Sequence, residues 1–443
     1  MSRIAEANHS ELLYVPPWRK WLSWDGQRWC SDDGVGVNQR ASRYATSLWK
    51  LTGDLARDLG RNDLARVITY IKRTNDACKM NDFRKLAAYD ERVVCPVDEL
   101  NIDPTLLNVA NGTIDLTTGE LRPHNPADRI TQLADVVFDP NATCTTWLSS
   151  LKLYFDGDDE LTRYVQQLLG YSISGDTREH ILPIAFGTGN NGKSTVWNSA
   201  AELLGDYAAL ANDTLLMGTK DNHPTDKASL YQKRFVAISE PEKGSHLKES
   251  RVKELTGDNM ITARRMKEDF WTFQRTHTFW LSTNYLPRID GKDNGIWRRI
   301  KLLPFTVDIK DKVQPIPDFD KWLVQHEGPG ILAWLVRGYL DYQENGFIEP
   351  ASVIQATTGY KDDSDPFGEF IDEYFITKAD AICTANDAYR VYVDSNAGSM
   401  TKMAFGLALS ERFRKSRPDH GAYRKRTIYE GLTPRYLPGN TPE

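Results

Sequence analysis

The sequence predicts an α/β fold with a largely parallel sheet, preceded by a mixed α/β accessory domain and followed by a winged-helix-like module. From about residue 145, short apolar segments of strand length alternate with segments of helical periodicity, an order typical of parallel sheets. A glycine-rich loop joins one of these strands to the next helix, which is the setting of a phosphate-binding loop. The expected domains span residues 1–144, 145–310 and 362–443, with a helical connector at 311–361.

The composition is that of a globular protein, with 443 residues of which 40% are hydrophobic and 26% charged. No apolar run approaches the roughly 18 residues needed to span a bilayer, and the N-terminus lacks a secretory-signal pattern, which excludes the membrane and secreted classes. The five cysteines include no CxxC pair, which argues against a disulfide framework or a cysteine-based zinc site. Because the net charge is −6, a nucleic-acid-binding surface must be a local patch.

The first 144 residues contain short strands and two helical segments. Asp25-Gly26 lies between tryptophan-rich runs and predicts a tight hairpin. Helical periodicity covers 45–59 and 62–73, and turn signals divide 108–124 into short strands. No catalytic constellation is present, so an accessory domain with an ordinary core is expected.

The elements of the central region can be located by their patterns. Helical periodicity marks 147–155, 160–173 and 194–205, and apolar runs mark strands at 180–186, 234–240 and 278–284. A further amphipathic helix is expected at 331–343, and an acidic stretch at 361–366 is expected to be a linker or turn. The chain ends in three helical segments and a basic, strand-like segment.

The glycine-rich loop matches the pattern GxxxxGK[ST]. Its glycines let the backbone approach phosphates closely, and N–H groups at the start of the next helix bind the anion. In such a loop the lysine reaches the β- and γ-phosphates of ATP and the serine hydroxyl is a ligand of Mg²⁺. The alternative is a glycine-rich turn with a surface lysine. The residues concerned are Gly187, Thr188, Gly189, Asn190, Asn191, Gly192, Lys193 and Ser194, with Thr195 next in the helix.

A phosphate loop requires a carboxylate at the end of a neighbouring strand, which holds Mg²⁺ and polarises the attacking water. The strand at 234–240 ends in Glu240, the first candidate for this role, and Glu242 is the second. Asn284 ends the strand at 278–284 and is a candidate for positioning the water, or alternatively only terminates the strand.

Two adjacent arginines, Arg298 and Arg299, precede an apolar strand that ends at Phe305. An arginine pair beside an α/β nucleotide domain is a candidate for stabilising the transferred phosphoryl group across a subunit boundary. The alternative is a pair of surface arginines in ordinary ion pairs.

Two basic segments are candidate DNA contacts. Residues 260–273 read as a hairpin with Lys267 at its tip and with Arg265, two residues earlier, on the same face; Arg264 precedes them. A solvated charged hairpin is the alternative. The basic end of the chain is compatible with a winged helix that faces DNA phosphates. Its plausible contacts are Arg412, Arg414, Lys415, Arg424, Lys425 and Arg426.

The ordered series of segments resembles the superfamily 3 helicases of the phage, plasmid and poxvirus helicase–primase type. The matching segments, in family order, are GTGNNGKST, FVAISEPEKG, VKELTGDNMITARRMKEDFWTF, FWLSTN and DNGIWRRIKLLPF. The segments WLSWDGQRW and NVANGTIDLTTGELRPHNP also look like the domain that precedes the ATPase in this family. The resemblance covers about residues 11–310 well and the C-terminal module more loosely.

The resemblance implies a RecA/AAA+-like core that works as a hexameric ring and binds ATP and Mg²⁺ between subunits. It assigns the sensor to Asn284 and the trans-acting arginine to Arg299, with Arg298 as the fallback. It also implies that Lys267 and Arg265 lie on the hairpin that grips single-stranded DNA. Many relatives carry adjacent acidic residues in the second motif, whereas Pro241 separates the two glutamates here, which leaves metal ligand and water activator unassigned between them.

The resulting hypothesis is an ATP-driven helicase that acts on single-stranded and forked DNA during replication of a phage or mobile element, in a bacterial cytoplasm. Since the primase domain of full helicase–primases is not recognisable, no primase activity is expected and a separate primase or other replication proteins are expected as partners. The alternatives are a DNA-packaging or remodelling ATPase, and an ATP-regulated origin-binding or helicase-loading protein. A packaging or remodelling motor would need a nuclease-like acidic cluster or a partner domain, and the sequence shows neither. The loading protein differs from the helicase in whether turnover depends on single-stranded DNA.

Overall fold

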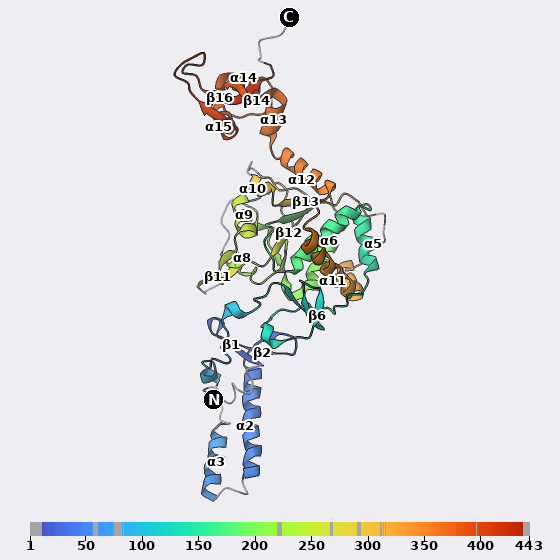
Figure 1. Ribbon diagram of the computed structural model, residues 1–443, viewed down its shortest axis with the longest axis vertical. Coiled ribbons are helices and arrows are strands. Elements are labelled where there is room, and N and C mark those ends of the chain that lie inside the picture. Colours follow the sequence, from blue (N-terminus) through green and yellow to red (C-terminus); the bar gives the residue numbers. More distant parts are fainter. Residues whose placement is uncertain are drawn as a thin grey trace. The chain divides into compact units, whose positions relative to one another are not determined.

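The computed structural model describes residues 11–55, 61–74, 82, 84–218, 224–265, 269–289, 294–310, 312, 314, 316–395 and 397–436. The chain forms two compact units, of which the first contains Met1–Pro287 and Arg298–Ile354 and the second Arg288–Trp297 and Gln355–Glu443. Figure 1 shows their helices and strands and labels many of them. Among the helices within the described ranges, none combines the length and apolar character needed to cross a membrane.

Three antiparallel strands begin the first unit: β1 (Leu12–Val15), β2 (Lys20–Trp24) and β3 (Trp29–Asp32), with the 3₁₀ helix η1 (Pro16–Trp18) between the first two. The expected Asp25-Gly26 hairpin is confirmed, because Asp25 Oδ1 accepts the N–H groups of Gln27 and Arg28 while Gly26 has a φ of 105°. The two expected helices follow as α2 (Val35–Leu55) and α3 (Arg61–Thr74), which contact each other. The first begins earlier than expected.

A second antiparallel sheet contains β4 (Leu106–Val109), β5 (Gly112–Asp115) and β6 (Glu120–Arg122), as the turn signals at 108–124 predict. The short helices η2 (Val97–Glu99) and η3 (Pro126–Asp128) flank it. Leu107, Val109 and Ile114 of this sheet belong to the same hydrophobic core as the central region. The two parts therefore share one core.

The central sheet is parallel, as predicted, with the strand order β13-β7-β12-β9-β8. Its strands are β7 (Leu182–Phe186), β8 (Ala208–Ala211), β9 (Phe235–Ile238), β12 (Thr278–Thr283) and β13 (Ile300–Pro304). The helices α5 (Thr145–Tyr154), α6 (Asp159–Ile173) and α7 (Lys193–Leu204) lie where their periodicity predicts them. The helices η4 (Gly205–Tyr207) and η5 (Asp213–Leu215) flank β8.

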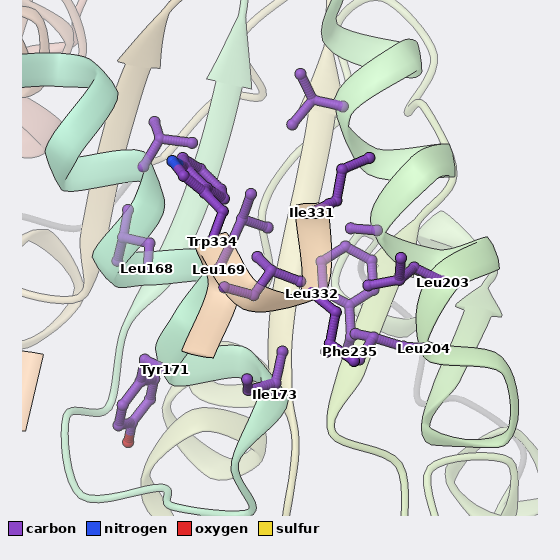
Figure 2. Packing of buried hydrophobic residues seen from close by; sticks show 14 of the residues in the cluster. Leu168, Leu169, Tyr171, Ile173, Leu203, Leu204, Phe235, Ile331, Leu332 and Trp334 are labelled. Carbon is purple, nitrogen blue, oxygen red and sulfur yellow. The ribbon is translucent and has the colours of Figure 1, made fainter. Parts of the chain in front are cut away.

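The 27-residue helix α11 (Phe319–Asn345) packs against α5, α6 and α7. Figure 2 shows Leu332 and Trp334 of α11 among Leu168 of α6, Leu203 of α7 and Phe235 of β9. Glu327 of α11 also accepts the first N–H groups of α5, from Thr146 and Trp147 at 2.8 Å each. This helix, in the stretch expected to connect two domains, is thus part of the core of the first unit.

Between β8 and β12 the chain forms α8 (Pro224–Ala228), α9 (Glu249–Gly257) and the antiparallel pair β10 (Met260–Arg264) and β11 (Phe270–Gln274). The predicted hairpin at 260–273 is therefore confirmed. Its expected tip, Lys267, lies outside the described residues.

The second unit contains α10 (Asn294–Trp297), α13 (Pro366–Tyr374), β14 (Phe375–Thr384), α14 (Ala385–Asp394), α15 (Lys402–Arg412), β15 (Arg414–Ser416) and β16 (Ile428–Pro434). Its three strands form an antiparallel sheet in the order β14-β16-β15. α12 (Ala351–Asp363) begins in the first unit and continues into the second. The expectation of a linker at 361–366 was wrong in part: α12 continues to Asp363, and Asp365 caps α13 by accepting the Gly368 N–H.

Candidate functional site

The glycine-rich loop connects the carboxyl end of β7 to the start of α7. β7 is paired with β13 on one side and with β12 on the other, and the chain continues through α7 to the far edge strand β8. The loop therefore lies at a switch point of the parallel sheet, where ligands of open α/β folds bind.

Packing requires glycine at both ends of this loop. A Cβ on Gly187 would collide with the carbonyl oxygen of Phe305, and a Cβ on Gly192 would lie 2.5 Å from ring atoms of Tyr154. Gly192 also has a φ of 84°, in the left-handed region that disfavours other residues. Two hydrogen bonds hold the loop against the chain after β13: Asn191 Nδ2 donates to Phe305 O at 3.0 Å, and the Ile309 N–H donates to Asn190 O at 2.8 Å.

The loop presents backbone donors at the start of a helix. Within the described parts of the chain, the N–H groups of residues 188–192 donate no hydrogen bond. The first N–H groups of α7 also have no intrahelical acceptor, and the helix dipole adds positive potential at the same end. Such a cluster of N–H groups binds anions, phosphate above all.

Lys193 points back into this loop instead of into solvent. Its side chain is only 5% exposed, and Nζ donates to Gly187 O at 2.7 Å, Asn191 Oδ1 at 3.0 Å and Asn284 Oδ1 at 3.1 Å. Burial lowers the pKa of the ammonium group, and the charge of Glu240 opposes this shift. A buried cation with three neutral oxygen partners is strongly stabilised by an incoming anion, since charges interact more strongly away from water.

The ends of β9 and β12 bring two predicted residues together. The strands are parallel neighbours, and the Asn284 N–H donates to Glu240 Oε1 at 2.8 Å. Because Asn284 also accepts from Lys193, one hydrogen-bonded chain joins Glu240, Asn284 and Lys193. The structure thus places the predicted loop lysine, carboxylate and amide at one edge of the sheet.

The remaining predicted residues of this edge lie around that chain. Ser194 and Glu240 are exposed, while Thr195 is half-buried and hydrogen-bonds the Tyr154 side chain. Glu242 is exposed beyond Pro241, and no described contact joins it to Lys193 or Asn284. The described residues contain no cluster of three acidic, histidine or cysteine ligands. One hydroxyl and one carboxylate suit Mg²⁺ that is held mainly by phosphates and water, rather than a protein cage.

The predicted arginine pair lies at the amino ends of the strands, opposite the carboxyl ends that carry the glycine-rich loop. Ile300 pairs with Leu182 at the amino end of β7, five strand positions or about 17 Å before Gly187, the first residue of the glycine-rich loop. Arg299 is 7% exposed and donates to Thr256 Oγ1 at 3.1 Å, whereas Arg298 is exposed. Neither residue is placed at the glycine-rich loop of its own chain.

The two described arginines of the hairpin lie beside different aromatic rings. Arg264 lies opposite Phe270 in the strand pair, with its guanidinium 5.1 Å from the ring centroid, and Arg265 lies 5.5 Å from the Trp271 ring. Phe270 is 59% exposed and Arg264 is half-buried, so the Phe270 ring is the part of this pair that faces solvent.

The basic residues of the second unit fall into two groups. Arg412 forms an ion pair with Asp365 and lies over Phe367, and Arg414 is 3.8 Å from Glu430, so both have partners within the unit. Lys415 is exposed, as are the three basic residues of the turn before β16. These are Arg424, Lys425 and Arg426.

Tyr154 and Phe305 were not among the predicted site residues, although the first packs against Gly192 and the second accepts from Asn191. Both act through packing or a backbone carbonyl. Such roles leave no signal in residue type, and only the contacts of the folded chain identify them.

Two family models match the chain. The model described as D5 N terminal like matches residues 1–156, and a family of unknown function (DUF5906) matches residues 185–299. The second match includes the glycine-rich loop, Glu240, Asn284 and both arginines.

Several viral proteins are similar in sequence. A protein of Acanthamoeba polyphaga mimivirus named "Putative helicase" is 25% identical over 392 residues, with 80% of this chain and 40% of the relative covered. A "Putative primase" of African swine fever virus is 24% identical over 348 residues, covering 72% and 36%. A "Putative helicase" of Frog virus 3 is 24% identical over 262 residues, covering 54% and 26%. The chain spans 40% or less of the length of these relatives.

Two solved structures of the NrS-1 C-terminal region resemble the chain over nearly its full length. An A-form apo structure has a TM-score of 0.54 at 11% identity and covers 97% of this chain and 98% of that one. A further apo structure has a TM-score of 0.51 with the same coverage. At this identity the similarity concerns the fold alone.

Proposed function

We propose, from the premise that this chain is related to the D5-like superfamily 3 helicase–primases, that it is an ATP-driven DNA helicase acting in DNA replication. The observation that carries the proposal is Lys193, a buried cation with only neutral partners at the base of a loop whose N–H groups are free to bind an anion. A triphosphate satisfies both features at once.

In this proposal the loop N–H groups and Lys193 bind the β- and γ-phosphates. When a phosphate arrives, Lys193 exchanges the carbonyl of Gly187 for phosphate oxygens and keeps its contact with Asn284. Ser194 and Glu240 supply the oxygen ligands of Mg²⁺, whose chemistry is to neutralise charge on the phosphates. Asn284 holds the Glu240 carboxylate through its N–H, which fixes the base beside the attacking water. Glu242 remains the second candidate for that base.

The arginine pair supports action between subunits. An arginine whose strand begins about 17 Å from the loop of its own chain stabilises a phosphoryl group only when it belongs to a neighbouring subunit. Arg298, which is exposed, suits this role better than Arg299, which is bound to Thr256 inside its own subunit. A ring of subunits, proposed here as a hexamer, supplies one such arginine to each nucleotide.

DNA contacts are proposed at the β10–β11 hairpin and in the second unit. Arg264, Arg265 and Lys267 offer cations at the hairpin, where hydrolysis would move a bound strand. From Pro366 onward, the second unit has the element order helix, strand, two helices and two strands, which supports the proposal of a winged helix. Its exposed turn carries Arg424, Lys425 and Arg426, which are proposed to contact phosphates.

Steady-state ATP hydrolysis with and without single-stranded DNA at low salt tests the proposal. We expect strong stimulation by DNA, loss of hydrolysis in Lys193→Ala, and little change in Lys152→Ala, which removes an exposed lysine from α5. Unwinding of a forked substrate should fail in Lys267→Ala while basal hydrolysis persists. Hydrolysis by Lys193→Ala at the unaltered rate would contradict the nucleotide site.

The second candidate is an ATP-regulated origin-binding or loading protein, which the exposed basic turn at 424–426 also fits. Slow hydrolysis that single-stranded DNA does not change would favour this alternative. Viral relatives are compatible with either function.

A further inference from the structure

A cationic pocket lies in the N-terminal part of the first unit, away from the glycine-rich loop in sequence. This cavity of about 300 Å³ is formed where the start of β2 meets the helical residues 84–87. Its charged lining residues are Arg19, Lys20, Asp32, Asp33, Arg84 and Lys85. Four basic residues from two segments more than 60 positions apart are thus brought to one cavity in a chain whose net charge is −6.

The backbone positions the first two cations. Arg19 adopts the left-handed conformation (φ 52°) that closes the η1 turn, and its N–H donates to Pro16 O at 3.0 Å. Lys20 follows as the first residue of β2. Both side chains are exposed, so the turn presents two adjacent positive charges at the cavity.

One of the two carboxylates that line the cationic pocket is engaged by backbone groups. Asp32 is buried and its oxygens accept the N–H groups of Gly34, Gly36 and Val37 at 2.8–3.0 Å, so it caps α2. Within the described ranges, Arg19, Lys20 and Lys85 form no ion pair, which leaves Asp33 as the carboxylate available to the pocket. Clustered like charges repel one another, and a polyanion relieves that repulsion.

An adjoining cavity of about 970 Å³ shares Tyr14, Arg19 and Lys85 with the cationic pocket. It is also lined by Tyr89, which is 83% exposed, and by two carboxylates, Glu91 and Glu99, of which Glu99 forms an ion pair with Arg129. Exposed aromatic rings beside a row of cations are the combination that binds single strands, because phosphates contact the cations and bases stack on the rings.

We propose that the cationic pocket binds the phosphodiester backbone of single-stranded DNA, with a base against Tyr89. The proposal rests on the proposed function for the identity of the strand as DNA. It adds a binding site in the accessory part of the chain, separate from the hairpin and from the nucleotide loop.

The test measures binding of a fluorescein-labelled oligothymidylate to the full chain, without nucleotide, over a range of salt concentrations. The triple variant Arg19→Ser, Lys20→Ser, Lys85→Ser should lower affinity about 100-fold at 0.1 M salt and reduce the slope of log K against log salt by about 2, at about 0.7 per lost phosphate contact. The control variant Arg66→Ser, Lys72→Ser, Arg73→Ser removes equal charge from exposed positions of α3 and should leave both quantities nearly unchanged.

Two further measurements make the outcome specific. Photocrosslinking of a bromouridine-containing strand to the wild-type protein should label a peptide that contains Tyr89, and this readout needs no variant to fold. Basal ATP hydrolysis by the triple variant should equal that of the wild type, so failure of the pocket is separable from failure of the nucleotide site, which Lys193→Ala reports.

An unchanged affinity and slope in the triple variant would overturn the proposal, as would an equal loss in the control variant. A third result would also overturn it. If inorganic tripolyphosphate binds the Lys193→Ala protein tightly and this binding requires the same three residues, the pocket is a site for a free polyphosphate and not for a strand.

Discussion

Arg234 is a buried cation whose removal should destabilise the first unit measurably. It is 5% exposed, and its guanidinium donates to Ile173 O at 2.8 Å and to Leu106 O at 2.6 Å. These acceptors lie at the end of α6 and in β4, so one side chain joins the accessory sheet to the central layers just before β9. The guanidinium also lies 4.6 Å from the centroid of the Tyr207 ring.

The expected magnitude follows from these contacts. Arg234→Met keeps the apolar stem but removes the donor from two buried carbonyl oxygens, which costs about 1–3 kcal/mol for each. Removing a buried charge offsets part of this loss, because burial lowers the pKa of the guanidinium and so disfavours its charged form. We therefore expect the free energy of unfolding to fall by about 3 kcal/mol.

Urea denaturation followed by tryptophan fluorescence measures this change, since Trp197 and Trp280 are buried in the core of the same unit. Arg66→Met is the control, because that side chain is 85% exposed and its loss should cost under about 0.5 kcal/mol. Arg234→Lys should recover only part of the stability, since a single ammonium group does not reproduce the planar fork. A loss below about 1 kcal/mol in Arg234→Met would refute the reasoning.

Two other predictions concern backbone strain and pH. Gly192→Ala places an alanine in the left-handed region, at about 1–2 kcal/mol, and adds a contact with Tyr154. It should therefore lower stability and ATP affinity more than Gly157→Ala, where φ is 77° and the space is open; equal losses in unfolding free energy would rule out the contact. Burial, with a smaller contribution from Arg275, lowers the pKa of His277 to about 3. Below about pH 6.5 the imidazole of the unfolded chain therefore binds a proton, whereas that of the folded chain stays neutral. As the pH falls further, the free energy of unfolding decreases by about 1.4 kcal/mol per pH unit, down to about pH 3. Between pH 7.5 and 5, the free energy of unfolding measured by urea titration should therefore decrease by about 2 kcal/mol less in the His277→Phe variant than in the wild type. The same pH dependence in both proteins would contradict this.

Most of the central sheet was predictable because its buried strands carry their own signal, whereas the partly exposed edge strand β8 was not predicted. Buried parallel strands appear as short apolar runs, and each of the runs at 180–186, 234–240 and 278–284 contains a strand of the sheet. The glycine pattern located the loop for a similar reason, since few residues other than glycine can adopt the backbone conformation of this loop. Residue type and local structure agree at these positions.

β14 was not predicted, and its burial explains why. Residues 376–380 of this strand are exposed, so its sequence shows no alternation of apolar and polar side chains. The strand is held mainly by pairing with β16, which involves backbone groups common to all residues. The place of α11 in the core of the first unit was not predicted for another reason: periodicity indicates a helix but not the neighbours against which it packs.

The arginine pair shows where sequence reasoning about the site ends. Both arginines lie in the turn between α10 and β13, where no sequence periodicity indicates which side chain is buried. The structure buries Arg299 against Thr256, a residue of α9 that lies 43 positions earlier. A choice that depends on one distant hydroxyl is beyond any local pattern.

Two independent physical requirements explain why the loop has glycine at these positions, and both affect the interpretation of variants. Phosphate binding requires close approach of the backbone, while Phe305 and Tyr154 independently exclude a Cβ at Gly187 and Gly192. A substitution at either glycine therefore disturbs the local packing, so a loss of ATP hydrolysis in such a variant does not by itself show that the loop binds phosphate. Lys193 is different, because burying its cation among neutral oxygens disfavours the charged form and so gives the empty fold no evident benefit. Substitution of this lysine is thus the change that separates nucleotide binding from packing.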